Sequence, residues 1–215
     1  MPGMAASSRI FDGIRLDETL FELYRLDWFL PHKGMSLTDY AKKMCEKVLH
    51  HYPVLLGVSF GGLLVKEMAQ HIDISKIIVV SCVKSNKELP KRMLFAKYTK
   101  VHKLLPTGLI NNVELLAKYA FGETVTKRLD LYEQYLALRD KQYIDWAIDA
   151  IVNWKQARPP INLIHIHGER DAVFPIGNIN GCIEVKNGTH TMIIHRARWF
   201  KEHLPKLILN KSDLF

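Results

Sequence analysis

The chain has 215 residues, of which 48% are hydrophobic and 24% are charged. This length suits one globular domain with a sizeable core, and the composition excludes a disordered or fibrous protein. The formal net charge is +8, but lysines and arginines stand singly or in pairs with acidic residues between them. We therefore expect no nucleic-acid partner.

Nothing in the sequence predicts a membrane protein or a secreted one. The longest apolar runs are far shorter than the ~18 residues that cross a bilayer, and the first residues lack the charged start and apolar core of a signal peptide. We expect a cytoplasmic protein with no membrane partner. The three cysteines, Cys45, Cys82 and Cys182, are widely spaced, which favours buried free thiols over a disulfide framework or a metal site.

Short apolar runs bounded by turn residues alternate with helical patterns along the chain. This alternation is typical of β-α units, in which helices cover both faces of a parallel sheet. The run at 53–58 is apolar at nearly every position, as expected for a strand buried on both faces. We predict an α/β fold with a mostly parallel, doubly wound sheet, whose strands lie at 20–30, 53–58, 76–82, 161–167 and 182–186.

Helices are predicted between these strands. Ser36 and Asp39 have the spacing of a capping box and precede apolar residues that share one helical face. A second helix should begin just after Ser59, and the last should span about 191–204.

The middle of the chain differs from the rest, because it shows helical periodicity and no convincing strand. We interpret 87–158 as a helical cap. It is inserted into a core that consists of residues 1–86 and 159–215.

Residues 57–61 read Gly-Val-Ser-Phe-Gly and match the pattern G-x-S-x-G. In this pattern, the nucleophile elbow, a serine occupies a strained turn between a strand and a helix, and the glycines avoid clashes with the crowded backbone. The motif follows an apolar strand and precedes an amphipathic helix, which is the setting that this role requires. We predict that Ser59 is a nucleophile. The alternative is a glycine-rich turn with an incidental serine.

A serine hydroxyl is a weak nucleophile at neutral pH, so it needs a base, and the base needs a group that orients it. The predicted strand at 161–167 leads into a loop that contains Glu169 and Asp171, and the strand at 182–186 leads to His190. Loops at the carboxyl ends of parallel strands meet at one edge of a sheet. We therefore expect His190 and one of the two carboxylates near Ser59.

Other histidines offer alternatives. His195 and His203 compete with His190 as the base, but both fall in the last predicted helix. His165 and His167 alternate along a strand and so share one face, where two imidazoles could bind a metal. Further ligands at recognisable positions are not evident, which favours hydrogen-bonded packing residues.

Together these motifs resemble the α/β-hydrolase superfamily over nearly the whole chain. The resemblance covers the elbow at Ser59, an inserted helical cap, a G-x-x-D pattern that ends at Asp171, and the loop of His190. It implies a catalytic triad in which His190 is the general base and Asp171, rather than Glu169, orients it.

The opening residues Pro2-Gly3-Met4 are similar to the H-G-x oxyanion loop of the family, with proline in place of histidine. The resemblance implies that the backbone N–H groups of Met4 and Phe60 bind the oxyanion. In the family this loop follows a central strand, so we expect an apolar strand of about five residues upstream of Met1. Otherwise the first two predicted strands would have to pair directly.

The resemblance implies a serine hydrolase that cleaves a small ester, thioester or related acyl compound through an acyl-enzyme on Ser59, without a metal or organic cofactor. A lyase similar to menaquinone-pathway synthases, in which the triad abstracts a proton, is one alternative, and a noncatalytic ligand-binding member is another. No predicted triad residue lies in 87–158, so deleting that segment should change substrate preference and leave Ser59 reactive. The identity of the substrate and the oligomeric state are not predicted.

Overall fold

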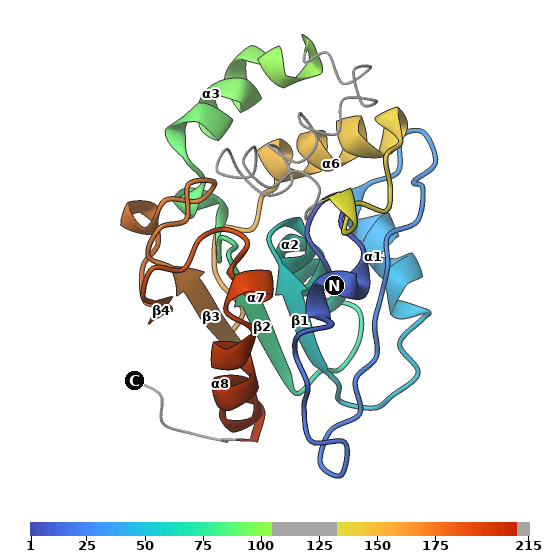
Figure 1. The fold of residues 1–215 in the computed structure, drawn as a ribbon. Helices are drawn as coiled ribbons and strands as arrows, with labels where there is room; N and C mark the ends of the chain where they lie inside the picture. Colours follow the sequence, from blue (N-terminus) through green and yellow to red (C-terminus); the bar gives the residue numbers. More distant parts are fainter. Residues whose placement is uncertain (105–132, 210–215) are drawn as a thin grey trace.

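Four parallel strands form the centre of the protein (Figure 1). The structure, a computed structural model, describes residues 1–104 and 133–209. The strands lie side by side in the order β1 (Val54–Val58), β2 (Lys76–Val80), β3 (Leu163–Gly168) and β4 (Ile183–Val185). Every pairing is parallel, so the carboxyl ends of all four strands lie at one edge of the sheet. The predicted α/β class is confirmed.

Helices cover both faces of this sheet. In Figure 1, α2 (Phe60–Met68) lies behind the strands, and α1 (Leu37–Cys45) packs against it. On the front face lie α7 (Met192–His195) and α8 (Ala197–Leu209). The strands between these layers are deeply buried, and residues 77–80 of β2 are at most 1% exposed.

The ends of two predicted helices can be compared with the structure. As predicted, Ser36 caps α1, because its Oγ accepts a hydrogen bond from the Asp39 N–H at 3.0 Å. The last predicted helix is instead divided into α7 and α8. The backbone of Arg196 leaves the helical conformation between them (φ −113°, ψ 27°), and its guanidinium group donates to the Asn187 carbonyl at 3.3 Å.

Residues 20–30 form no strand, so the first predicted strand is wrong. The edge of β1 that could have received it is occupied by Met1, whose amino group donates to the Leu56 carbonyl at 2.6 Å and whose carbonyl accepts from the Val58 N–H at 3.1 Å. The segment therefore runs outside the sheet. Its apolar pattern reflects burial only in part: Leu20 is 64% exposed and Tyr24 is 55% exposed, whereas Leu26, Trp28 and Phe29 pack against the core.

The described part of the 87–158 segment contains helices separated by non-helical stretches, such as residues 134–140. Its helices α3 (Lys91–Thr99) and α6 (Lys141–Asn153) lie above the carboxyl ends of the strands in Figure 1. Residues 105–132 of the predicted cap lie outside the described residues, and the division into core and cap stays a prediction. Short 3-10 helices complete the fold: η1 (Ser8–Phe11), η2 (Asn86–Glu88), η3 (Val101–Leu104) and η6 (Ile176–Asn178).

No helix in the described ranges combines the length and the apolar character of a membrane span. The three cysteines are free thiols; Cys45 and Cys82 are buried, and Cys182 is partly exposed. The cytoplasmic location stays a prediction.

Candidate active site

Ser59 lies in the turn that joins β1 to α2. Its backbone has φ 52° and ψ −120°, a conformation that L-residues rarely adopt and that costs ~1–3 kcal/mol. The predicted strand-turn-helix setting is therefore present, and the serine occupies the strained position. An incidental serine in a glycine-rich turn would not need this conformation.

The two glycines that flank Ser59 are required by close backbone contacts. A Cβ atom at Gly57 would lie 2.3 Å from the carbonyl oxygen of Gly61, and one at Gly61 would lie 2.3 Å from the carbonyl oxygen of Pro2. Backbone atoms cannot move aside as a flexible side chain can. The glycine pattern in the sequence thus reflects the crossing of β1, α2 and the first residues of the chain.

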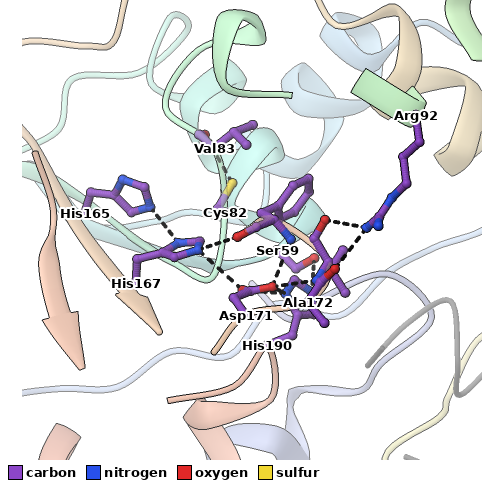
Figure 2. Close-up of polar contacts among 11 residues, drawn as sticks. Ser59, Cys82, Val83, Arg92, His165, His167, Asp171, Ala172 and His190 are labelled. Atoms are coloured by element: carbon purple, nitrogen blue, oxygen red, sulfur yellow. Dashed lines mark hydrogen bonds and ion pairs between the residues drawn. The ribbon is translucent and has the colours of Figure 1, made fainter. Parts of the chain in front are cut away.

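The side chains of Ser59, His190 and Asp171 form one hydrogen-bonded line (Figure 2). His190 Nε2 lies 2.9 Å from Ser59 Oγ, and His190 Nδ1 lies 2.8 Å from Asp171 Oδ2 and 3.0 Å from Oδ1. These residues come from three loops at the carboxyl ends of β1, β3 and β4. The structure therefore brings together the three side chains that the sequence singled out.

Asp171 is held as a carboxylate inside the protein. Burial raises the pKa of its carboxyl group, but the charge and hydrogen bond of His190, the charge of His167 and the Phe174 N–H together leave the pKa below its ordinary value. Oδ1 also accepts the N–H groups of Val173 and Phe174, each at 2.9 Å. The loop thus holds the Asp171 carboxylate opposite His190 Nδ1. A carboxylate at this place favours the His190 tautomer that carries its proton on Nδ1.

The alternative acid and bases lie elsewhere. Glu169 is exposed, and its Oε2 accepts the Asn187 N–H at 2.8 Å. His195 is exposed on α7, and His203 Nδ1 lies 2.8 Å from the Trp199 carbonyl on α8. The hydrogen bonds of Glu169 and His203 thus lead away from Ser59.

The predicted oxyanion loop lies against Ser59. A Cβ atom at Gly3 would be 3.6 Å from Ser59 Cβ, and Met4 is buried beside it, with 6% exposure. Phe60 is the first residue of α2, so its N–H has no acceptor inside the helix. The contact of Gly3 with Ser59 and the place of Phe60 directly after it are compatible with the predicted role of the Met4 and Phe60 N–H groups, which itself stays a prediction.

Comparison with known proteins relates this architecture to solved structures. No protein-family model and no curated protein matches the chain. An esterase from Exiguobacterium antarcticum matches with a TM-score of 0.63 and 17% identity, over 98% of this chain and 92% of that chain. A bromoperoxidase from Bacillus anthracis matches with a TM-score of 0.62 and 16% identity, over 97% of this chain and 92% of that chain. A thermophilic esterase from Thermogutta terrifontis matches with a TM-score of 0.59 and 12% identity, over 96% of this chain and 88% of that chain.

The chain has the α/β-hydrolase fold. Likeness at these identities establishes the fold, and the chemistry has to be argued from the site.

A buried histidine pair lies beside the acid loop of this α/β-hydrolase fold (Figure 2). His167 Nε2 lies 2.8 Å from the Phe174 carbonyl, so it carries a proton, and His167 Nδ1 lies 3.2 Å from His165 Nε2. Burial lowers the pKa of His165 to about 3 and also lowers that of His167. The described residues contain no group of three or more His, Cys, Asp or Glu side chains that could hold a metal, and the reading of the pair as packing residues stays a prediction.

Some contacts around the site could not be read from the sequence. Arg92 on α3 donates to the carbonyls of Ala172 at 3.1 Å and Val173 at 2.6 Å, directly after Asp171 (Figure 2). Tyr143 on α6 accepts the N–H of Ala5, next to Met4, at 3.2 Å. The Arg92 contact with Ala172 joins residues that are 80 positions apart, and the Tyr143 contact joins residues that are 138 positions apart. Neither Arg92 nor Tyr143 belongs to a motif.

A separate hollow of about 720 Å³ lies between α1, α2 and α6. Glu67, Trp146 and Trp154 contribute to its lining, whereas no residue of the Ser59, His190 and Asp171 line does. It is therefore distinct from the candidate active site.

Proposed function

We propose that this chain is a serine hydrolase that acts on a small ester, thioester or related acyl compound. The observation that carries the proposal is the line from Ser59 Oγ through His190 to Asp171, with separations of 2.9 and 2.8 Å. A strained serine, a histidine within hydrogen-bond reach and a buried carboxylate behind it are what an activated hydroxyl nucleophile requires. The esterases among the similar structures support this reading.

In the proposed mechanism, Ser59 Oγ attacks the acyl carbonyl carbon while His190 Nε2 takes its proton. The carbonyl oxygen becomes an oxyanion, which accepts hydrogen bonds from the N–H groups of Met4 and Phe60. His190 then gives the proton to the leaving group, and the acyl-enzyme remains on Ser59. Water, activated by His190, releases the acid, while Asp171 supports the imidazolium in both steps.

The first test is covalent labelling with a fluorophosphonate, followed by peptide mass mapping and by a burst assay with p-nitrophenyl acetate. We expect one label on Ser59 and its loss in Ser59→Ala. Ser81→Ala is the matched control, because Ser81 is also buried with a positive φ of 48°, and its Oγ has no hydrogen-bond partner in the described structure.

The outcomes separate the candidate functions. Turnover that survives Ser59→Ala in clean protein would refute the hydrolase proposal. Labelling of Ser59 without turnover of any ester would favour the lyase, and the absence of both would favour a ligand-binding protein.

The same assay identifies the acid. Asp171→Asn should lower kcat by up to about 10⁴-fold, because an amide at this position favours the wrong tautomer of His190. Glu169→Gln should change it little, since Glu169 contacts the Asn187 N–H instead. A larger loss in Glu169→Gln would reverse the assignment.

A further inference from the structure

We propose that Tyr143 and Trp28 are positioning residues, which hold the residues on either side of Met4 so that its N–H faces the reacting carbonyl at Ser59. This inference rests on the proposed hydrolase function and on the oxyanion role of Met4. It assigns part of the active-site framework to α6, within the segment predicted to be a cap.

Tyr143 fixes the loop from one side. Its side chain is fully buried, and its hydroxyl accepts the N–H of Ala5 at 3.2 Å. The backbone donor next to Met4 is therefore already used and cannot compete for the oxyanion.

Trp28 holds the residue that precedes Met4. Its indole Nε1–H donates to the Gly3 carbonyl at 2.8 Å. The same ring stacks on Phe60, with centroids 4.9 Å apart and planes 9° apart. Trp28 thus contacts both Phe60, which supplies the second predicted donor, and the residue that precedes Met4. A single side chain sets the spacing between the two donors.

The backbone conformation of Ala5 indicates that hydrogen bonds from other parts of the chain constrain the loop. Its φ of 60° is unfavourable for a residue other than glycine. The Ala5 carbonyl accepts the Ala137 N–H at 2.8 Å, the Ser7 N–H donates to the Tyr135 carbonyl at 2.7 Å, and Ala6 forms an antiparallel bridge with Leu136. Residues 135–137, which also belong to the predicted cap, therefore maintain the bend.

These contacts argue against the expectation that removing 87–158 leaves Ser59 reactive. Without the Tyr143 hydroxyl and the 135–137 strip, Ala5 would keep only the turn closed by the Ala6 N–H and the Gly3 carbonyl at 3.1 Å. Met4 would then lose its fixed position opposite Ser59. A displacement of about 1 Å at such a donor can cost about 100-fold in rate.

The test compares two tyrosines, of which one contacts the loop and the other is exposed. Tyr143→Phe removes the acceptor for Ala5 and keeps the ring. Tyr52→Phe is the control, since Tyr52 is 67% exposed and lies before the amino end of β1, whereas Ser59 follows its carboxyl end. Both variants are assayed for melting temperature, for kcat and KM with p-nitrophenyl acetate, and for the rate of fluorophosphonate labelling.

We expect Tyr143→Phe to lower kcat and the labelling rate by about 10- to 100-fold, with KM within about twofold of wild type and an unchanged pH profile. Tyr52→Phe should keep the wild-type melting temperature and both rates. Equal rates in the two variants, with wild-type Ser59 labelled, would overturn this inference alone. A wild-type protein that neither labels nor turns over would refute the proposed function, and this inference with it.

Tyr143→Phe could fail to fold, in which case Trp28→Phe gives the same test at Gly3. It removes the Nε1–H donor and keeps an aromatic ring on Phe60. Loss of kcat at constant KM supports the inference, and wild-type kcat overturns it.

Discussion

At the scale of single residues, the His165 and His167 pair shows how burial links the candidate site to pH. The pKa of His165 falls from its ordinary 6.5 to about 3, mainly through burial and then through the charge of His167. Between these values the unfolded chain binds a proton that the folded protein does not. Above pH 6.5 this histidine therefore does not change the free energy of unfolding. As the pH falls from 6.5 towards 3, the free energy of unfolding decreases, by up to about 1.4 kcal/mol per pH unit.

The corresponding prediction concerns His165→Gln, which keeps a donor for His167 Nδ1 but cannot titrate. Its free energy of unfolding, measured in urea from pH 6.5 down to pH 4.5, should depend less steeply on pH than that of wild type. His71→Gln, at an exposed position, serves as the control and should retain the wild-type slope. A wild-type slope in His165→Gln would mean that His165 already carries its proton in the folded state.

Residues that belong to motifs could be found from the sequence, whereas residues that act through contacts could not. Ser59, Asp171 and His190 follow strands in a recognisable order, and parallel strands must bring their carboxyl ends together. Tyr143 and Trp28 have no such order. Their role depends on which hydroxyl or indole reaches a backbone group more than 20 residues away in sequence, and apolar periodicity does not encode that.

At the scale of elements, the crossing of β1 and α2 makes the most specific demand on the sequence. Gly57→Ala would place a Cβ atom 2.3 Å from the Gly61 carbonyl oxygen. We expect a loss above about 4 kcal/mol, a large share of the ~5–15 kcal/mol that stabilises a domain. Gly177→Ala is the control, because nothing lies within 4 Å of its added Cβ, and it should change stability by less than about 1 kcal/mol. Equal melting temperatures for the two variants would show that the crossing tolerates a side chain at Gly57.

Elements with strong burial patterns were predictable, and those whose environment depends on distant residues were not. β1 and β2 are apolar at nearly every position because both faces are covered. The 20–30 segment has apolar residues too, but the edge of β1 is taken by Met1. Lys66 on α2 shows the opposite, because it is a charged residue that is fully buried. Its Nζ donates to the Val83 carbonyl and lies 3.8 Å from the centre of the Trp154 ring.

At the scale of the whole molecule, the described part of the 87–158 segment shares its hydrophobic core with the sheet. Leu136, Tyr143, Ile144 and Trp154 belong to the same buried cluster as the residues of β2. A cap that could open as an independent body would have a core of its own. The shared cluster instead favours one cooperative unfolding unit.

The last prediction follows from that shared core: far-UV circular dichroism and tryptophan fluorescence should give the same midpoint in urea. Fluorescence reports on the 87–158 segment because Trp146 and Trp154 belong to it, and because the Trp28 ring centre lies 5.6 Å from that of Tyr143. The fluorescence would therefore change first if the segment detached from the sheet. Ile144→Ala removes a side chain that is 1% exposed and should lower both midpoints together, with a cost of about 2–5 kcal/mol. A fluorescence midpoint well below the dichroism midpoint, in wild type or in Ile144→Ala, would show that the segment unfolds alone and that its contacts with the oxyanion loop can be lost while the sheet remains intact.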